Sequence, residues 1–240
     1  MAEKLDINTL RTPLQDILSI EHSDIHYIRC RVLIVCEGEK TEPNYFKSFS
    51  MMKNHSNLVY DVTTDGGKIN TKDVVKKAIE LRDKAKKNGE PYDSVWAVFD
   101  KDSFPDNDFN GAIQMAESNN IGCAWSNEAF ELWYVYHFDF RSTPLSRKKY
   151  KSIITTRVKK AGYSSFVYKK NNPAMRQILL GCGCNENDAI RNAKSQVEQY
   201  ADKKFHKHNP ATTVYKLVSL LLGQDKDFNK KIAHDVNRRG

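Results

Sequence analysis

The chain has 240 residues, of which 40% are hydrophobic and 28% are charged, and its formal net charge is +8. Such a chain is long enough for one α/β core with a helical extension, and its composition is that of an ordinary globular protein. No apolar run approaches the length of a membrane span, and the first residues lack the apolar segment of a signal peptide. These features argue against a membrane or secreted protein, so we expect a cytoplasmic protein with no membrane partner.

The five cysteines are an odd number, and two of them fall in apparent core strands, so we interpret them as reduced thiols. A zinc site could be considered for Cys182-Gly183-Cys184 together with His206-Lys207-His208. The one-residue gap between the cysteines is shorter than the usual gap of about two to four residues, and the two motifs lie far apart. We therefore do not predict zinc.

Residues 1–28 contain some apolar positions without clear periodicity, and we interpret them as an N-terminal arm. The first strand is predicted at about residues 30–36, where the apolar run from Val32 to Cys36 is rich in β-branched residues. Such a run is typical of a central parallel strand that is covered on both faces. It ends at the turn Glu37-Gly38-Glu39, and the sequence from Thr41 favours the start of a helix.

Strands and helices then alternate along the chain. Strands are predicted at residues 57–64, 95–99 and 121–125, and helices near 73–88, near 109–116 and at 128–138, the last capped by Ser126-Asn127. The order β-α-β-α-β-α-β-α favours a mainly parallel sheet flanked by helices, joined by right-handed crossovers.

The segment from residue 140 to 185 contains no Asp or Glu and carries eleven Lys and Arg residues, so the rest of the chain has a net charge of −3. Aromatic residues are interleaved with these charges, a combination expected where a nucleic-acid backbone is tracked and exposed bases stack. The aromatic residues are Tyr150, Tyr163, Phe166 and Tyr168. The predicted nucleic-acid-binding residues are Arg147, Lys148, Lys149, Lys151, Arg157, Lys159 and Lys160.

Helical patterns follow this basic segment. One apolar stripe runs from Ile190 to Ala201, and another from Val214 to Leu221, where Asn209 is predicted as the cap with Pro210 in the first turn. The last ten residues are expected to be frayed. We therefore predict an arm at 1–28, an α/β core at 29–140, and a basic, helical region at 141–240 packed on that core.

Acidic residues follow both buried strands at the point where each strand ends. Glu37 and Glu39 follow the first strand, and Asp100 and Asp102 follow the strand at 95–99. In open α/β sheets, ligands bind outside the carboxyl ends of the strands. Side chains two residues apart on a strand point the same way, so the two aspartates can converge, and Glu37 can join them if the strands are neighbours.

Carboxylates held this close repel one another unless a cation compensates, and oxygen ligands select a hard ion. The sequence therefore predicts a Mg²⁺ or Mn²⁺ site formed by Glu37, Asp100 and Asp102. An alternative is that these acids only cap the helices that follow.

The predicted helix at 128–138 holds two further candidates. His137 lies on an aromatic face with Phe130, Trp133 and Tyr134, where a histidine is more often a buried core residue than a catalyst. Glu131 lies on a different face of the helix and could add a fourth carboxylate to the site.

The strand that ends in Glu37-Gly38 and the strand that ends in Asp100-Lys101-Asp102 resemble the two signatures of the Toprim domain, which topoisomerases, bacterial primases and several nucleases share. The block CEGEKTEPNYF, the FDKDSF strand, the block SNEAFELWYVYHF and the late NPATTVYKLV are more specifically similar to the RloB-like family of prokaryotic proteins. The resemblance extends from about residue 31 to 222. It implies acid/base work for Glu37 and Mg²⁺ coordination by Asp100 and Asp102, and it links the chain to restriction and phage-defence loci.

The first functional hypothesis is a metal-dependent nuclease that cleaves DNA or RNA. Glu37 or Glu39 would move the proton, and Lys40 would stabilise the charge that develops on the phosphate. The chain has no Walker-type glycine-rich loop, so any ATP hydrolysis would come from a partner ATPase.

Two alternative functions are considered. One is a non-catalytic nucleic-acid-binding or effector subunit of a defence complex. The other is a phosphatase with an aspartate nucleophile, although the D-x-D motif of such phosphatases normally follows the first strand.

Overall fold

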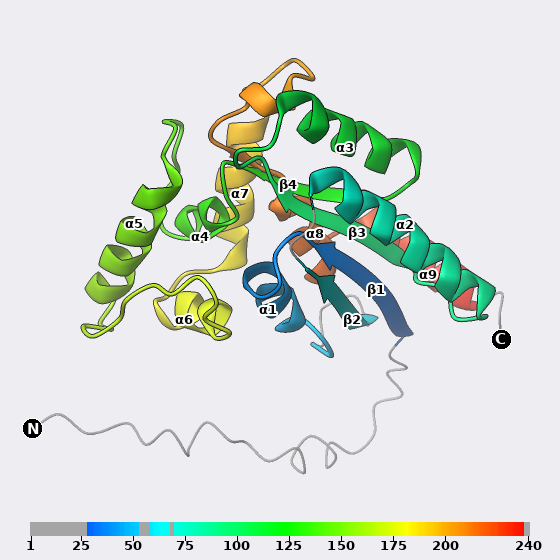
Figure 1. Ribbon diagram of the computed structural model, residues 1–240. Helices are drawn as coiled ribbons and strands as arrows, with labels where there is room; N and C mark the ends of the chain where they lie inside the picture. Colours follow the sequence, from blue (N-terminus) through cyan, green and yellow to red (C-terminus); the bar gives the residue numbers. More distant parts are fainter. Residues whose placement is uncertain (1–27, 53–57, 68–69, 238–240) are drawn as a thin grey trace, which may run out of the picture.

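The computed structural model describes residues 28–52, 58–67 and 70–237, and the predicted N-terminal arm lies outside this range except for its last residue. Within it, five strands form one sheet in the order β2-β1-β3-β4-β5 (Figure 1). The strands are β1 (Ile28–Cys36), β2 (Leu58–Gly66), β3 (Ser94–Asp100), β4 (Gly122–Asn127) and β5 (Ala211–Thr212). β1 to β4 are parallel and β5 pairs antiparallel with β4, so the predicted mainly parallel sheet is confirmed.

Successive residues of β1 belong to different cores, which explains its continuous apolar run. Val32 and Ile34 belong to one buried cluster, whereas Leu33 and Val35 belong to the other. Both faces of the strand are therefore buried, as in other parallel strands that are covered on two sides. Because alternate side chains enter opposite layers, the register of this strand fixes which way the residue after Cys36 points.

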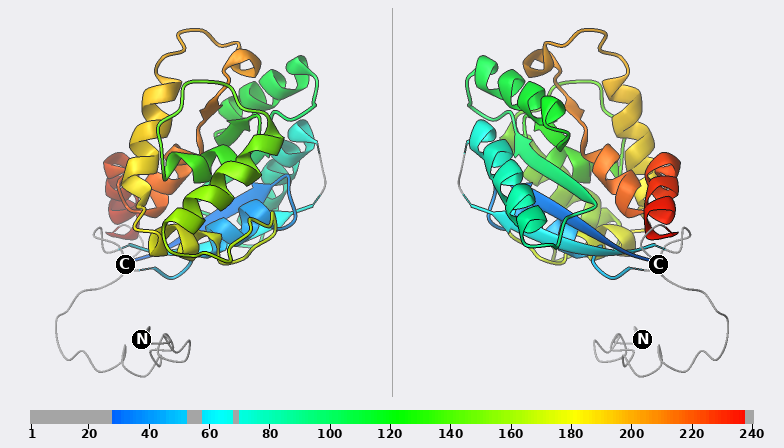
Figure 2. Two further views of the ribbon diagram at one scale, coloured as in Figure 1. Left: turned by 90° about the vertical axis from the view of Figure 1, so that its left-hand side faces the viewer. Right: turned by 90° about the vertical axis from the view of Figure 1, so that its right-hand side faces the viewer.

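Helices cover both faces of the sheet. α2 (Thr71–Lys87) and α3 (Asp106–Ser118) lie side by side over one face (Figure 2, right). The other face carries α1 (Thr41–Lys47), α4 (Glu131–Tyr136) and α8 (Val214–Leu221). None of the helices in the part of the chain that the structure describes is long and apolar enough to cross a bilayer.

The basic region is folded against this second face. Its helices α5 (Arg147–Lys160) and α6 (Met175–Gly181) lie in front of the sheet in the left view of Figure 2, and α7 (Glu186–Val197) packs against both α4 and α8. Tyr150, Ile154 and Leu179 belong to the same buried cluster as Phe130 and Trp133. The basic region and the sheet therefore share one hydrophobic core.

Three boundary predictions were wrong. Ser126-Asn127 does not cap α4, because both residues lie in β4 and the helix begins four residues after Asn127. Asn209 does not cap α8, because the chain first forms β5 and the helix begins after Thr213. The last ten residues were predicted to be frayed, but residues 231–237 belong to α9 (Lys226–Asn237), which buries Ile232, and residues 238–240 lie outside the described range.

A buried ion pair links the basic region to the start of the chain's core. Arg176 Nε donates to Glu186 Oε1 at 2.6 Å, and both side chains are almost fully buried. The guanidinium also lies 3.9 Å from the centre of the Phe49 ring, beyond the end of α1. Since a buried charge without its partner is costly, this pair holds α6, α7 and α1 in one arrangement.

We predict that Glu186→Gln lowers the free energy of unfolding by about 3 kcal/mol, because Arg176 would stay buried with its charge uncompensated. Urea unfolding followed by circular dichroism measures the change. The matched control is Glu198→Gln, which removes the same charge from an exposed pair with Lys194 just after the same helix and should change stability by less than about 0.5 kcal/mol. Equal effects of the two substitutions would contradict a role for the buried pair.

Candidate active site

The predicted acids surround a pocket of about 470 Å³ at the carboxyl ends of β1 and β3. It is lined by Glu37, Gly38, Glu42, Asn70, Asp100, Asp102, Phe104, Arg147 and Lys170. The lining comes from the end of β3, the turns after β1 and β3, the residue before α2, the starts of α1 and α5, and the loop before α6. This is the end of a parallel sheet where ligands bind in other α/β proteins.

Glu37 and Asp100 lie together because β1 and β3 are neighbours. The Glu37 N–H donates to the Val98 carbonyl at 2.9 Å, which continues the pairing of the strands by one residue. The Asp100 N–H then donates to Glu37 Oε2 at 3.1 Å. Backbone and side chain thus hold the glutamate directly beside the aspartate.

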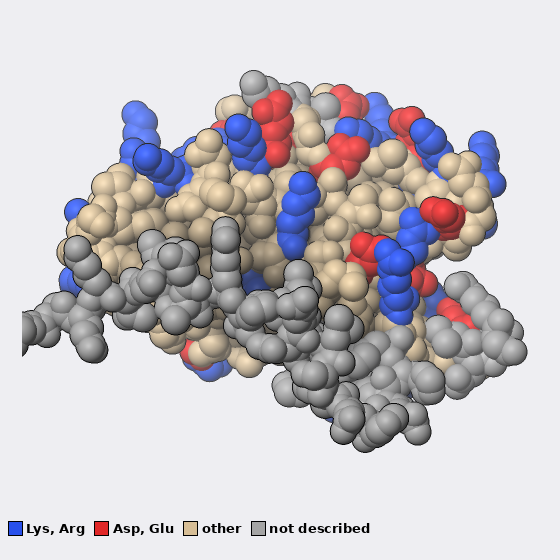
Figure 3. All heavy atoms as spheres, turned by 90° about the horizontal axis from the view of Figure 1, so that it is seen from below, with Lys and Arg blue, Asp and Glu red and all other residues tan. Residues whose placement is uncertain are grey.

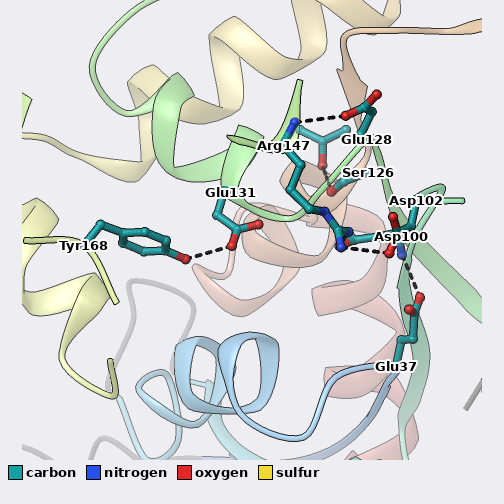
Figure 4. A network of polar contacts seen from close by, with 9 residues as sticks. Glu37, Asp100, Asp102, Ser126, Glu128, Glu131, Arg147 and Tyr168 are labelled. Atoms are coloured by element: carbon teal, nitrogen blue, oxygen red, sulfur yellow. Dashed lines mark hydrogen bonds and ion pairs between the residues drawn. The ribbon is translucent and has the colours of Figure 1, made fainter. Parts of the chain in front are cut away.

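Asp100 and Asp102 share a cationic partner, Arg147, at the first position of α5. Arg147 Nη2 donates to Asp100 Oδ2 at 3.2 Å, and Nη1 donates to Asp102 Oδ2 at 2.7 Å (Figure 4). Asp100 is only 5% exposed, and Asp102 has the left-handed backbone conformation, with φ of 38°. Aspartate tolerates that conformation better than most residues, and here it turns the second carboxylate back toward the guanidinium.

Glu42 is the pocket acid that the sequence analysis missed. It lies in the first turn of α1, is 3% exposed, and its Oε2 has no hydrogen-bond partner among the described residues. Its carboxylate packs over Gly38, where a Cβ atom would collide with it, so a side chain at position 38 would require the Glu42 carboxylate to shift. The sequence analysis interpreted this acid only as part of a helix start, because nothing in the local sequence distinguishes it from an ordinary glutamate in a first helical turn.

Glu131 is buried on the inner side of the same acidic group. Its Oε1 accepts a hydrogen bond from the Tyr168 hydroxyl at 3.0 Å, and its Oε2 has no partner within the described part of the chain. Glu131 acts electrostatically on both Glu42 and Asp100. It extends the acidic group inward, although it is not part of the pocket lining.

Burial, together with neighbouring carboxylates, raises the pKa values of Glu37, Asp100 and Glu42. Burial raises the pKa of Glu37 to about 7, with nearby carboxylates adding to the effect. Burial and three neighbouring carboxylates raise the pKa of Asp100 well above its usual range, and burial likewise raises the pKa of Glu42. Burial alone would lower the pKa of Arg147, but the acids around it outweigh this effect and raise it. A cation is therefore favoured in this pocket, and Arg147 supplies one.

The donor atoms of the pocket acids are of the type that a hard metal ion prefers. The acidic donors are oxygens only, and one of them, Glu42, is buried with an unpartnered oxygen, which suits Mg²⁺ or Mn²⁺. As the side chains lie, however, no three Asp, Glu, His or Cys groups in the described residues are arranged around one ion position. The guanidinium of Arg147 occupies the space between the two aspartates (Figure 4).

Three predicted site residues lie elsewhere. Glu39 and Lys40 are exposed, and neither is among the residues that line the pocket. His137 is buried in the core, where its Nδ1 lies 2.9 Å from the Trp133 carbonyl oxygen, and burial lowers its pKa to about 4. The interpretation of His137 as a core residue therefore fits its surroundings.

The predicted nucleic-acid-binding residues lie on α5, and most of them are exposed. Lys148, Lys149, Lys151, Lys159 and Lys160 face solvent, and Arg157 pairs with Asp139 at 2.5 Å. In Figure 3, basic side chains prevail at the left-hand end, where α5 lies in Figure 1, and mix with acidic ones toward the right. The expected stacking of the interleaved aromatics is wrong for Tyr150 and Tyr168, which are buried in the core.

The mainly parallel sheet, with a glutamate after β1 and an Asp-x-Asp pair at the end of β3, defines a Toprim-like α/β protein. Comparison with protein families gives a more specific result. The family model described as RloB-like protein matches residues 32–221, and the chain belongs to this family. Comparisons with curated proteins and with solved structures found no match.

The raised pKa of Glu37 predicts a particular dependence of stability on pH. Between the ordinary pKa of 4.5 and about 7, the folded state binds more protons at Glu37 than the unfolded state does. The contribution of this residue to stability is therefore present below about pH 4.5 and is lost as the pH rises through about 7.

We therefore expect Glu37→Gln to lose less stability than the wild type between about pH 5 and about pH 8, by on the order of 2 kcal/mol after allowance for solvent screening. Urea unfolding at a series of pH values measures the difference. Glu39→Gln, in the same turn but exposed, should follow the wild-type curve. Parallel curves for Glu37→Gln and the wild type would contradict the assignment.

Proposed function

We propose that this protein is a metal-dependent nuclease that hydrolyses phosphodiester bonds in DNA or RNA. The observation that carries the proposal is the gathering of Glu37, Glu42, Asp100 and Asp102 around one pocket that also holds Arg147 and Lys170. Acids that bind a hard cation and basic groups that bind a phosphate are the two requirements of phosphodiester hydrolysis. The same function is supported by the Glu37-Gly38 and Asp100-Lys101-Asp102 signatures of this chain, which resemble those of Toprim nucleases.

Glu37, Asp100 and Asp102 would hold Mg²⁺ or Mn²⁺, with Glu42 close enough to the same pocket to contribute. When bound, the ion would polarise the scissile phosphate and lower the pKa of a water molecule. Glu37 is the best candidate for moving the proton, because it is the acid of the turn after β1 that lines the pocket and lies beside Asp100. Glu39, the other acid considered for this role, is exposed beyond the pocket lining.

We assign the stabilisation of charge on the phosphate, first predicted for Lys40, to Lys170 and Arg147. Both of these residues line the pocket, whereas Lys40 is exposed outside it. Thr41 Oγ1 donates to the Lys170 carbonyl at 2.6 Å, which ties the backbone of that loop to the start of α1. Lys170 also lowers the pKa of Glu42 against the effect of burial, so its charge acts on the acidic group. It is well placed to stabilise negative charge on a reacting phosphate.

The exposed lysines of α5 would bind the rest of the polymer. Arg147 begins this helix at the pocket, and the lysines continue along it away from the pocket. A nucleic-acid backbone on this surface would be held by phosphate contacts, which position a polymer without reading its sequence. As a nuclease of a defence locus, the protein would act on nucleic acid during phage infection, with a partner ATPase controlling its activity.

We predict that Asp100→Asn lowers the rate of Mg²⁺-dependent cleavage of labelled DNA or RNA by about a hundredfold or more, because the most buried carboxylate of the metal site loses its charge. Titration calorimetry with Mg²⁺ and Mn²⁺ on the same samples should show weaker metal binding.

The matched control for this experiment is Asp108→Asn. Asp108 lies on α3 close in sequence to the site, and its exposed carboxylate pairs with Lys72 at 2.7 Å. This variant should cleave at the wild-type rate. Cleavage by Asp100→Asn at the wild-type rate would refute the assignment of the site.

A second candidate function is favoured by one observation. Arg147 already compensates both aspartates, as a structural ion pair would in a non-catalytic binding or effector subunit. In that case Glu37→Gln would be tolerated in a phage-defence assay, whereas reversing the charge of Lys148, Lys149 and Lys151 would abolish function. The nuclease requires Glu37 in the same assay.

Lys170→Ala should lower the single-turnover cleavage rate by at least about tenfold, because the pocket loses a positive charge next to the reacting phosphate. Lys40→Ala removes the same charge from an exposed position in the turn after β1 and should change the rate by less than about twofold. Rapid-quench measurements with protein in excess separate this effect from polymer binding. A larger loss from Lys40→Ala than from Lys170→Ala would restore the role first predicted for Lys40.

A further inference from the structure

Arg147 is held at the pocket by three separate acids. Its guanidinium bridges Asp100 and Asp102, and its backbone N–H donates to Glu128 Oε2 at 3.0 Å. The residue is the first of α5, whose N-cap residue Ser146 makes no side-chain capping bond. The start of the basic helix is therefore fixed to the acidic site through this one residue (Figure 4).

The guanidinium and a metal ion compete for the same atoms. Arg147 bonds to one oxygen of each aspartate, the Oδ2 atoms, and these face the space between the two carboxylates. A Mg²⁺ ion binds carboxylate oxygens at about 2.1 Å, much closer than a guanidinium nitrogen does. Two cations so close together would repel strongly, so an ion can bind both aspartates only after Arg147 has moved.

Arg147 also has the freedom and the chemistry to move to another anion. Its side chain is 36% exposed, unlike the almost buried Asp100, and its Nε has no hydrogen-bond partner among the described residues. A guanidinium suits a phosphate group, which accepts two parallel hydrogen bonds as a carboxylate does. The exposed lysines on the same helix would bring a polyanion to it.

We propose that Arg147 is an intramolecular counter-ion that blocks the metal site until a nucleic-acid phosphate draws it away, so that metal and nucleic acid bind cooperatively. The inference rests on the proposed function, because it deals with the control of the same site. In the free protein, Arg147 neutralises Asp100 and Asp102. When the guanidinium pairs with a phosphate, the two carboxylates become free for the ion, and by linkage each ligand raises the affinity for the other.

The first test measures metal binding alone. Mn²⁺ is titrated calorimetrically into the full-length wild type, Arg147→Gln and the matched control Arg157→Gln. Arg157 is on the same helix with similar exposure, but it pairs with Asp139 and does not line the pocket. We expect Arg147→Gln to bind Mn²⁺ about tenfold more tightly than the wild type, a change of about 1.4 kcal/mol, and Arg157→Gln to bind like the wild type.

A conservative variant guards against misfolding of Arg147→Gln. Arg147→Lys keeps the charge but cannot bridge two carboxylates as a planar guanidinium does, so its affinity for Mn²⁺ should lie between those of the wild type and Arg147→Gln. Unfolding midpoints for all variants should accompany the titrations.

The second test measures the coupling. The affinity for a labelled single strand of DNA or of RNA is compared with and without Ca²⁺, a hard cation used here as the probe. The wild type and the control Arg82→Gln, which changes an arginine of α2 that pairs with Asp83, should bind the strand more tightly with Ca²⁺, by about tenfold, whereas Arg147→Gln should lose most of this difference.

The outcomes separate this inference from the proposed function. If Arg147→Gln binds Mn²⁺ no more tightly than the wild type while Asp100→Asn loses binding, Arg147 does not block the site, and the metal-dependent function stands. If none of the proteins binds Mn²⁺, the counter-ion role and the metal-dependent function are both refuted.

Discussion

The constraint on which this protein depends is the burial of several carboxylates at one end of a parallel sheet. Asp100, Glu42 and Glu131 are each nearly inaccessible, and together with Glu37 they act on one another electrostatically. Carboxylates in such surroundings must take up protons or gain a cation. Arg147 meets part of this requirement, and the rest explains why the pKa of Glu37 rises to about 7. The site thus carries an electrostatic cost that binding of a cation relieves, which is the physical basis for proposing a metal there.

The fold creates this constraint through strand register. Because β1 pairs in parallel with β3, Glu37 and Asp100 leave the sheet side by side, and the turn at Gly38 leaves room for Glu42 from the following helix. The same register buries the strands on both faces, and Asp100, the last residue of β3, is buried with them. The apolar runs that stabilise the sheet and the acids that end them are therefore one structural unit.

The sequence predicted those parts of the fold and of the site that depend on short, local patterns of residues. The buried strands, their alternation with helices, and the meeting of Glu37 with Asp100 all follow from apolar runs of limited length ending in acids. Elements that depend on tertiary contacts were missed: the sheet extends β4 through Ser126 and Asn127 by pairing it with β5, although both residues favour helix caps. Glu42 resembled an ordinary first-turn glutamate, because its burial depends on the pocket around it. Arg147 looked like one charge among eleven in the basic segment, since nothing local marks the residue that reaches the aspartates.

From charge composition alone, the acidic residues before residue 140 and the basic segment after it would be two separate parts of the protein. In the structure, residues of both parts line the same pocket. The countercharges of the pocket, Arg147 and Lys170, and the hydroxyl that binds Glu131 all come from the region after residue 140. Tyr150 and Tyr168, first interpreted as surfaces for base stacking, instead fix this region in the core that α4 shares with the sheet. This attachment holds Arg147, the first residue of α5, at one position relative to Asp100 and Asp102. Under the proposed function, a polyanion bound on α5 would therefore act on the helix whose first residue neutralises Asp100 and Asp102, and the charge state of the site would respond to occupancy of the basic surface.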